Sequence, residues 1–348
     1  MSKRTKGKIG YLAAKIDMAK AYDRVEWHFL EGVMRKMGFD ERWIRIVMLC
    51  VTTVSYSVLV NGHKSETFAP GRGIRQGDPL SPYLFLLCAE GLSAYTSQAI
   101  QQGRLHGFKP AQGAPVISHL FFADDSIFFT RATVPASLML KGILRDYEKE
   151  SGQQVSFQKS DVSFSKNVSH HRRLEIGGIL GMKVVEKHNK YLGLGTVAGR
   201  SKKELFGDIV ERIKKKLKGW KEKTLSVAAR EVLIRSVAEA QLNYAMSVFR
   251  VPEGVIDEVQ SLITRFWWGQ RGEERKAHWI NRDRLVMPKE MGGMGLRELR
   301  GLNTAFLAKQ LWGLLNQPES LIARILRAKY HKNDSILNAE LGYRPSFV

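Results

Sequence analysis

Apolar residues in the first half of the chain follow the spacings of short strands and amphipathic helices. The segment 11–16 (YLAAKI) predicts a strand that ends at Asp17. Asp23, with Glu26 three residues later, predicts a capping box at the start of a helix. Four apolar residues then recur at the spacing of one helix face: Val25, Phe29, Val33 and Met37.

Turn residues separate the elements that follow. Asn61-Gly62 predicts a tight hairpin turn, and Asp78 with Pro79 predicts the N-cap and first position of a long helix. The second of two expected hairpins is apolar on both faces of both arms, which indicates buried central strands. We expect helices over 41–51, 79–98 and 135–150, hairpins over 55–68 and 117–130, and a strand pair over 155–165.

Beyond about residue 200 only helical patterns remain, at about 200–223, 225–247, 253–269, 302–316 and 319–331. The first of them joins an apolar stripe to a strongly basic face. We therefore predict the α+β class, with an antiparallel sheet covered on one face by helices and a following all-helical part. The basic face is either a solvated surface or a contact to a nucleic-acid backbone.

Composition and charge narrow the possible functions. The chain has 348 residues, of which 44% are hydrophobic and 26% charged, so it folds. Its formal net charge of +21 indicates a polyanionic partner, most simply nucleic acid. Cys50 and Cys88 lie in apolar runs and predict no disulfide framework. With no membrane-spanning run and no secretory signal, we expect an intracellular protein, in the nucleus or cytoplasm.

Three aspartates stand out as candidate metal ligands. Asp17 ends a predicted strand, and Asp124-Asp125 lie at the centre of the second hairpin. Short carboxylates at neighbouring strand ends suit the octahedral oxygen coordination of Mg²⁺, and a cation would offset their mutual repulsion. The plain alternative is that Asp124-Asp125 form an ordinary turn. The apolar flanks weigh against it, because an unneutralised acidic pair between them would be costly.

Five segments occur in an order that resembles a known family: KIDMAKAYDRVEW, GIRQGDPLSPYLF, HLFFADDSIFF, SGQQVSFQKS and YLGLG. They look like the consecutive motifs of a reverse transcriptase, in particular the non-LTR, LINE-type enzymes of plant retrotransposons. The likeness continues into the helical part and covers nearly the whole chain. It implies RNA-directed DNA synthesis on an RNA template with a DNA primer and dNTPs, and no membrane partner.

The resemblance also implies roles for residues around the three aspartates. Asp17, Asp124 and Asp125 would be catalytic ligands of two Mg²⁺ ions, for which Mn²⁺ is a possible substitute, with Asp124 the firmer ligand of the adjacent pair. Tyr22 would pack under the sugar of the incoming nucleotide and exclude a 2′-hydroxyl. Without the motif, Tyr22 is equally well read as an aromatic packed at a helix start.

Further roles follow from the other motifs. Gln76 and Gly77 would line the nucleotide and template pocket, where glycine permits close backbone approach. Lys159 would act catalytically beside the leaving pyrophosphate. Leu192 and Gly193 would belong to the primer grip. Taken alone, Gln76 and Gly77 are ordinary turn residues, and Lys159 is an ordinary surface lysine.

The same likeness divides the chain into a palm at 1–199, a thumb at 200–270 and a helical extension at 271–348. The palm would be partial, because the fingers region of the family would precede it. An alternative is a catalytically inactive retroelement fragment that only binds nucleic acid. A third reading, a Mg²⁺-dependent cyclase or phosphatase with a similar sheet, does not explain the RQGDPLSP and thumb segments. The tryptophans at 267, 268, 279 and 312 are expected in the core rather than as base-stacking platforms.

Overall fold

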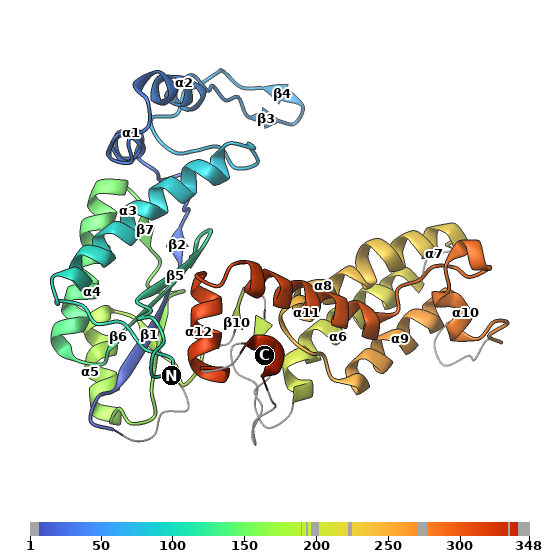
Figure 1. The fold of residues 1–348 in the computed structure, drawn as a ribbon. Helices are drawn as coiled ribbons and strands as arrows, with labels where there is room; N and C mark the ends of the chain where they lie inside the picture. The colour runs from blue at the N-terminus through green and yellow to red at the C-terminus, as the bar shows by residue number, and fades with distance from the viewer. Residues whose placement is uncertain are drawn as a thin grey trace. The chain divides into compact units, whose positions relative to one another are not determined.

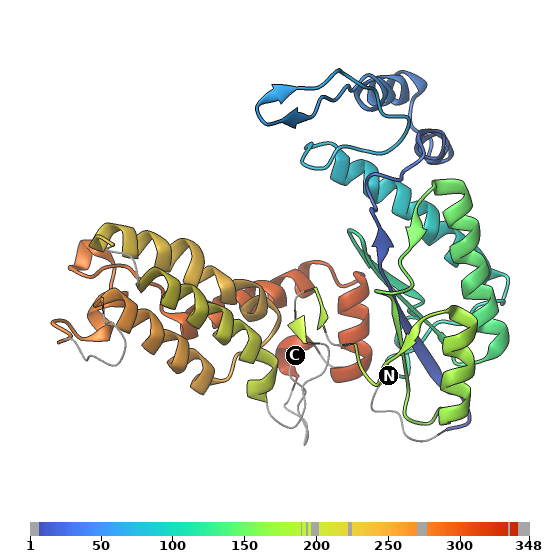
Figure 2. The ribbon, with the colours of Figure 1, turned by 180° about the vertical axis from the view of Figure 1, so that it is seen from behind.

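The computed structural model divides the chain into two units, Met1–Leu192 and Gly193–Val348. Figure 1 and Figure 2 show the ribbon from opposite sides. The residues that the structure describes are 7–188, 190–192, 194–195, 202–221, 225–269, 277–332 and 335–339.

Ten strands and five helices make up the described part of the first unit. The strands are β1 (Tyr11–Ile16), β2 (Met18–Ala19), β3 (Leu59–Val60), β4 (His63–Lys64), β5 (His119–Phe122), β6 (Asp125–Arg131), β7 (Gln154–Val155), β8 (Asp161–Phe164), β9 (Lys183–Val184) and β10 (Lys190–Tyr191). The helices are α1 (Trp27–Lys36), α2 (Glu41–Thr52), α3 (Ser81–Gln101), α4 (Val134–Ser151) and α5 (His170–Leu180).

A five-stranded sheet in the order β5-β6-β1-β8-β9 forms the centre of this unit. The β5-β6, β6-β1 and β1-β8 pairs are antiparallel, and β9 runs parallel to β8. Helices α3, α4 and α5 lie along one face (Figure 1). Side chains that alternate along β1 point into the core under these helices: Leu12, Ala14 and Ile16, each 0% exposed. The opposite face therefore carries the remaining β1 positions, Lys15 among them.

The predicted α+β class and the antiparallel sheet with helices on one face are confirmed. The strand at 11–16 and the helix at 135–150 fall within a residue of β1 and α4. In α4, Thr133 accepts a hydrogen bond from the Ala136 N–H, and Gly152 ends the helix in the left-handed conformation.

Two predicted helix starts are wrong. Helix α1 begins at Trp27 with Glu26 at the N-cap and no side-chain cap, so Asp23 and Glu26 form no capping box. Helix α3 begins at Ser81 rather than Pro79, and the Asp78 carboxylate accepts a hydrogen bond from the Leu80 N–H at 2.8 Å. Asp78 thus serves the turn before its helix, because a short aspartate side chain also bonds nearby backbone in turns, whereas Asp23 accepts from the Gln76 side chain.

Two strand predictions are also wrong. Strand β5 is an edge strand of the sheet and leaves Phe122 62% exposed, although both arms of the hairpin were expected to be central. The strands of the expected pair over 155–165 do not pair with each other. Instead β7 pairs with β2, and β8 pairs with β1. Pairing between distant segments is decided by the sheet as a whole, which local patterns do not contain.

The described part of the second unit is largely helical. It contains β11 (Leu194–Gly195), α6 (Lys202–Lys221), α7 (Val227–Leu233), the π-helix η1 (Ile234–Ala238), α8 (Ala240–Val248), α9 (Glu253–Trp267), α10 (Arg282–Val286), the 3₁₀ helix η2 (Lys289–Met291), α11 (Leu299–Asn316), α12 (Leu321–Tyr330) and the 3₁₀ helix η3 (Ile336–Asn338).

Apolar stripes of α6, α8 and α9 form the core of this unit. The predicted stripe of α6 is confirmed through Phe206, Ile209 and Ile213, which are at most 2% exposed. The helix expected over 225–247 is divided, because η1 separates α7 from α8. Trp267 lies in the core as expected, whereas Trp279 is 84% exposed and Trp312 is 66% exposed, so the core assignment is wrong for these two.

Candidate active site

The ends of β1 and β6 bring two of the three candidate aspartates opposite each other. The antiparallel register pairs Ile16 with Ser126, so the next residues in register are Asp17 and Asp125. Opposed residues of antiparallel strands project to the same face, with Cβ atoms about 5 Å apart. Asp17 and Asp125 are both half-buried. Their carboxylates therefore share the face of the sheet that the three helices leave free.

The backbone of Asp17 is fixed from both sides by one loop. Its N–H donates to Ser160 Oγ at 3.1 Å, and its carbonyl oxygen accepts from the Ser156 N–H at 2.8 Å. The same loop contains Lys159, whose N–H donates to the Ser156 carbonyl at 3.0 Å and whose side chain is exposed. Lys159 therefore lies in the same loop as Ser156 and Ser160, which bond the backbone of Asp17.

Asp124 lies in the two-residue turn between β5 and β6 and is exposed. Ala123, which precedes it, has a φ of 49°. Tyr22 stacks on Phe85 of α3 with ring centroids 4.8 Å apart and an interplanar angle of 11°. Partial burial, together with the negative charge of Asp124, raises the pKa of the Tyr22 hydroxyl. Tyr22 thus combines packing with electrostatic contact to the acidic centre.

A lysine also lies within this centre. Lys15 Nζ is 3.4 Å from Asp125 Oδ1, and the two side chains are 22% and 31% exposed. Within the described part of the chain, no three His, Cys, Asp or Glu side chains come together as a group that could hold a metal ion. The donor chemistry of Asp17, Asp124 and Asp125 nevertheless suits Mg²⁺, because hard carboxylate oxygens at strand and turn ends are its usual protein ligands.

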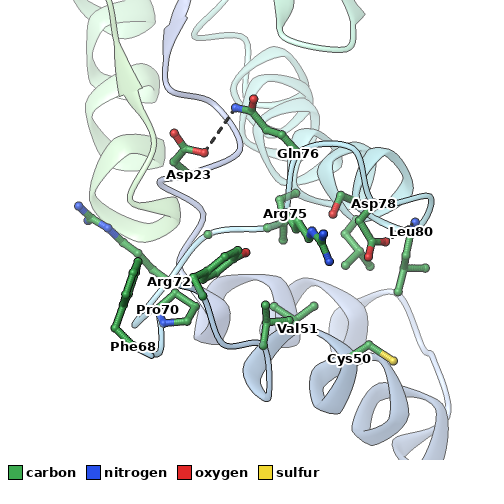
Figure 3. A pocket seen from close by; sticks show the side chains of 16 residues that line it. Asp23, Cys50, Val51, Phe68, Pro70, Arg72, Arg75, Gln76, Asp78 and Leu80 are labelled. Carbon is green, nitrogen blue, oxygen red and sulfur yellow. Dashed lines mark hydrogen bonds between the residues drawn. The ribbon is translucent and has the colours of Figure 1, made fainter. Parts of the chain in front are cut away.

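The loop that contains Gln76 and Gly77 is anchored on the segment after Asp17. The Gly73 N–H donates to the Val25 carbonyl at 2.8 Å, and the Ile74 N–H donates to the Tyr22 carbonyl at 3.0 Å. Gln76 Nε2 donates to Asp23 Oδ1 at 3.4 Å, so the exposed amide is held over the same segment (Figure 3). Gly77 is exposed, with a φ of 88°.

A pocket of about 470 Å³ lies under this loop, between α2, the base of the β3-β4 hairpin and the start of α3 (Figure 3). Its polar wall includes Asp23, Arg72, Arg75 and Gln76. Its apolar wall includes Val51, Val54, Phe68, Leu80 and Leu84. Gln76 is part of the lining of this pocket and Gly77 is not, and the nucleotide and template role of both residues stays a prediction.

The remaining predicted residues lie farther along the chain. Leu192 is half-buried and has a φ of 50°. Gly193 lies outside the described residues. The structure tests the primer-grip role of neither residue, and that role stays a prediction.

Sequence reasoning missed several residues of the centre, among them Lys15 and Ser160. It also missed a hydrogen-bonded chain on the same face. The Asp161 carboxylate accepts from His188 Nδ1–H, and His188 Nε2 is hydrogen-bonded to Ser163 Oγ at 2.9 Å. Asp161 and Ser163 alternate on β8, which is a signal in the sequence, but His188 is brought to them only by the fold.

Comparisons with known proteins agree with these motifs. Residues 2–196 match the family described as reverse transcriptase (RNA-dependent DNA polymerase). A putative ribonuclease H protein of Arabidopsis thaliana is 35% identical over 132 residues, which are 38% of this chain and 21% of that protein. The Pol polyprotein of the type-2 retrotransposable element R2DM of Drosophila melanogaster is 25% identical over 96% of this chain and 31% of its own length.

Among solved structures, a telomerase of Candida albicans in complex with a fragment of telomeric RNA is similar over 94% of this chain and 50% of that chain. Its sequence identity is 12% and the TM-score is 0.39. The matched parts of the chain span 21% and 31% of the lengths of the two curated relatives named above.

Proposed function

The chain belongs to the reverse transcriptase family, and from this premise we propose that it carries RNA-directed DNA polymerase activity of a non-LTR retroelement. The observation that carries the proposal is the opposed register of Asp17 and Asp125 at the free face of the sheet, with Asp124 in the adjoining turn. The match over residues 2–196 identifies the family. The opposed aspartates support a site at which nucleotide transfer would occur.

In the proposed reaction the primer 3′-hydroxyl attacks the α-phosphate of a dNTP, and pyrophosphate leaves. Asp17, Asp124 and Asp125 would hold two Mg²⁺ ions, which Mn²⁺ can replace. Such ions stabilise the negative charge on the attacking and leaving oxygens. Asp17 is suited to be a ligand, because hydrogen bonds to its N–H and its carbonyl oxygen fix the backbone from which its carboxylate projects.

The neighbouring residues would position the substrates. We assign Tyr22 to the sugar of the dNTP, since its ring is fixed by Phe85 and lies in the field of Asp124. Gln76 and Gly77 would contact the nucleotide and the template. Lys159, carried by the loop that holds Asp17, would donate a charge-assisted hydrogen bond to the leaving pyrophosphate.

Charge on the second unit supports a nucleic-acid partner. The stripe of α6 is buried, and its other face exposes Arg212, Lys215, Lys216 and Lys218. We propose that this face contacts phosphates of a template–primer duplex, which would be held by backbone and shape rather than by base sequence. In this proposal residues 1–199 would act as the palm, 200–270 as the thumb and 271–348 as a helical extension. In the described residues, no helix combines the length and apolar character needed to cross a bilayer.

Primer extension tests the proposal. Purified chain, an RNA template with a DNA primer, dNTPs and Mg²⁺ should give extended primer. Asp124→Asn and Asp17→Asn should each reduce the rate at least a hundredfold, because a lost ligand removes charge stabilisation in the transition state. Asp146→Asn is the matched control, since Asp146 is an exposed aspartate of α4 in the same unit.

The outcomes separate the proposal from its alternative. Extension that Asp124→Asn leaves unchanged would contradict the assigned site. A folded chain that binds hybrid with strong salt dependence but extends no primer, even when a fingers segment is supplied, would favour an inactive retroelement fragment that only binds nucleic acid.

A further inference from the structure

Among the described residues, Lys15 is the one positively charged side chain that forms an ion pair with any of the three candidate metal ligands, and its partner is Asp125. Lys15 and Asp17 are two positions apart on β1 and its end, so they share a face of the sheet. From that position Lys15 reaches diagonally across to β6, where Nζ is 3.4 Å from Asp125 Oδ1. The roles proposed above assign nothing to this lysine.

The neighbouring strand explains why Asp125 is the partner. The residue directly opposite Lys15 on β8 is Asp161. The Asp161 carboxylate already accepts a hydrogen bond from His188, which is 8% exposed and is itself bonded to Ser163. Asp161 is thus engaged by His188, and the ion pair with Asp125 brings the Lys15 ammonium to the metal ligands.

An ammonium beside a metal ligand has two electrostatic consequences. It neutralises a carboxylate that would otherwise repel Asp17 and Asp124 when no cation is bound. It also opposes a divalent ion, because the ion must share or displace the ammonium to use that carboxylate. With both side chains less than one-third exposed, solvent and salt screen these effects only partly.

We propose that Lys15 is a positioning residue that competes with the divalent cation for Asp125. In the chain without nucleic acid or dNTP, Lys15 holds Asp125 as its ion-pair partner, so that Asp125 adds less to metal affinity than Asp17 and Asp124 do. This inference rests on the proposed polymerase function and gives a physical reason why Asp124 and Asp125 would contribute unequally to metal binding.

Mn²⁺ binding without nucleic acid or dNTP tests the competition directly. Free Mn²⁺ is measured by electron paramagnetic resonance for wild type, Asp125→Asn, Lys15→Met and the double variant. We expect Asp125→Asn to weaken Mn²⁺ binding less than twofold in the wild-type background and at least fivefold in the Lys15→Met background. Lys15→Met alone should tighten binding severalfold. An equal loss from Asp125→Asn in both backgrounds overturns the inference.

Two further variants keep the test interpretable. Lys15→Arg retains the charge and should keep the loss from Asp125→Asn below twofold, which gives a second measurement if Lys15→Met does not fold by circular dichroism. Lys36→Met removes one exposed lysine at the end of α1 and should leave Mn²⁺ binding unchanged. A larger loss in the Lys15→Arg background, or tightening by Lys36→Met equal to that by Lys15→Met, overturns the inference.

Failure of this inference differs from failure of the proposed function. Wild-type chain that binds no Mn²⁺ refutes the metal centre and the inference together. Wild-type primer extension that is lost in Asp124→Asn, combined with equal losses from Asp125→Asn in the two lysine backgrounds, refutes the role of Lys15 alone.

Discussion

Replacing Gly73 by alanine tests how the RQG loop is held on the segment after Asp17. Gly73 has a φ of 89°, a conformation that residues with a side chain rarely adopt. A Cβ at this position would lie 2.7 Å from the Asp23 carbonyl oxygen and 3.1 Å from two further backbone atoms of Asp23. Backbone cannot move aside as a flexible side chain does, so the loop and the segment must separate.

The expected cost has two parts. The unfavourable φ costs about 1–2 kcal/mol for an alanine. Separation also lengthens the hydrogen bonds from the Gly73 N–H to Val25 and from the Ile74 N–H to Tyr22, which contribute about 1 kcal/mol each. We therefore expect Gly73→Ala to lower the free energy of unfolding of the first unit by about 2–4 kcal/mol.

Two neighbouring glycines separate these contributions. Gly77 has a φ of 88°, but a Cβ added there would meet no atom within 4 Å, so Gly77→Ala should cost only the backbone part, about 1–2 kcal/mol. Gly71 has open space and no unusual φ, so Gly71→Ala should be within about 0.5 kcal/mol of wild type.

The free energy of unfolding of the first unit is measured by urea unfolding of the full chain, with pulsed hydrogen exchange in peptides from β1 and α3 as the signal. The reasoning is refuted if Gly73→Ala costs no more than Gly77→Ala, because the close approach to Asp23 would then contribute nothing.

Three other changes have defined outcomes. Asn303→Ala should lower the free energy of unfolding of the second unit by about 3 kcal/mol in urea, because the buried Asn303 amide is hydrogen-bonded to backbone groups of Met246, Phe249 and Val251. The control Thr304→Ala, at an exposed position, should change it little. Tyr147→Phe should cost the first unit about 1–2 kcal/mol in urea by removing the donor to Cys88 O and Gln153 Oε1. Burial lowers the pKa of His119 in the folded chain, so the unfolded state takes up the proton first as the pH falls. The free energy of unfolding, measured in urea at several pH values, should therefore decrease below about pH 6.5, and should decrease less in His119→Gln.

Elements with strong local signals were predictable from the sequence. Helix α4 combines an apolar face with a threonine N-cap and a terminal glycine, and each signal acts within a few residues. Helix α5 was missed because its sequence, HHRRLEIGGIL, buries only Ile176, Gly177 and Leu180, too few positions for a recognisable stripe. The position of β5 at the sheet edge depends on which strands pair, and that is a property of the whole sheet.

The candidate site divides in the same way. That Asp17 and Asp125 would approach each other was predictable, because each lies at a strand end in an ordered set of motifs. That Lys15 would reach Asp125 depends on the register between β1 and β6, and that Asp161 would bond His188 depends on a residue that is distant in sequence. A single-residue shift of β6 against β1 would move Asp125 to the other face of the sheet from Lys15.

Backbone strain falls at the turns of the same motifs. Among the described residues, four non-glycine residues have positive φ: Lys20, Asn61, Ala123 and Leu192. Asn61 precedes Gly62 in a hairpin turn, where asparagine is commonly left-handed. The other three lie just after β2, immediately before Asp124, and in the YLG segment. Such a conformation costs on the order of 1 kcal/mol and persists only where surrounding contacts enforce it. Two of these three positions flank candidate metal ligands, since Lys20 lies three residues after Asp17 and Ala123 directly precedes Asp124, so the strained backbone lies next to the residues whose geometry the proposed reaction depends on.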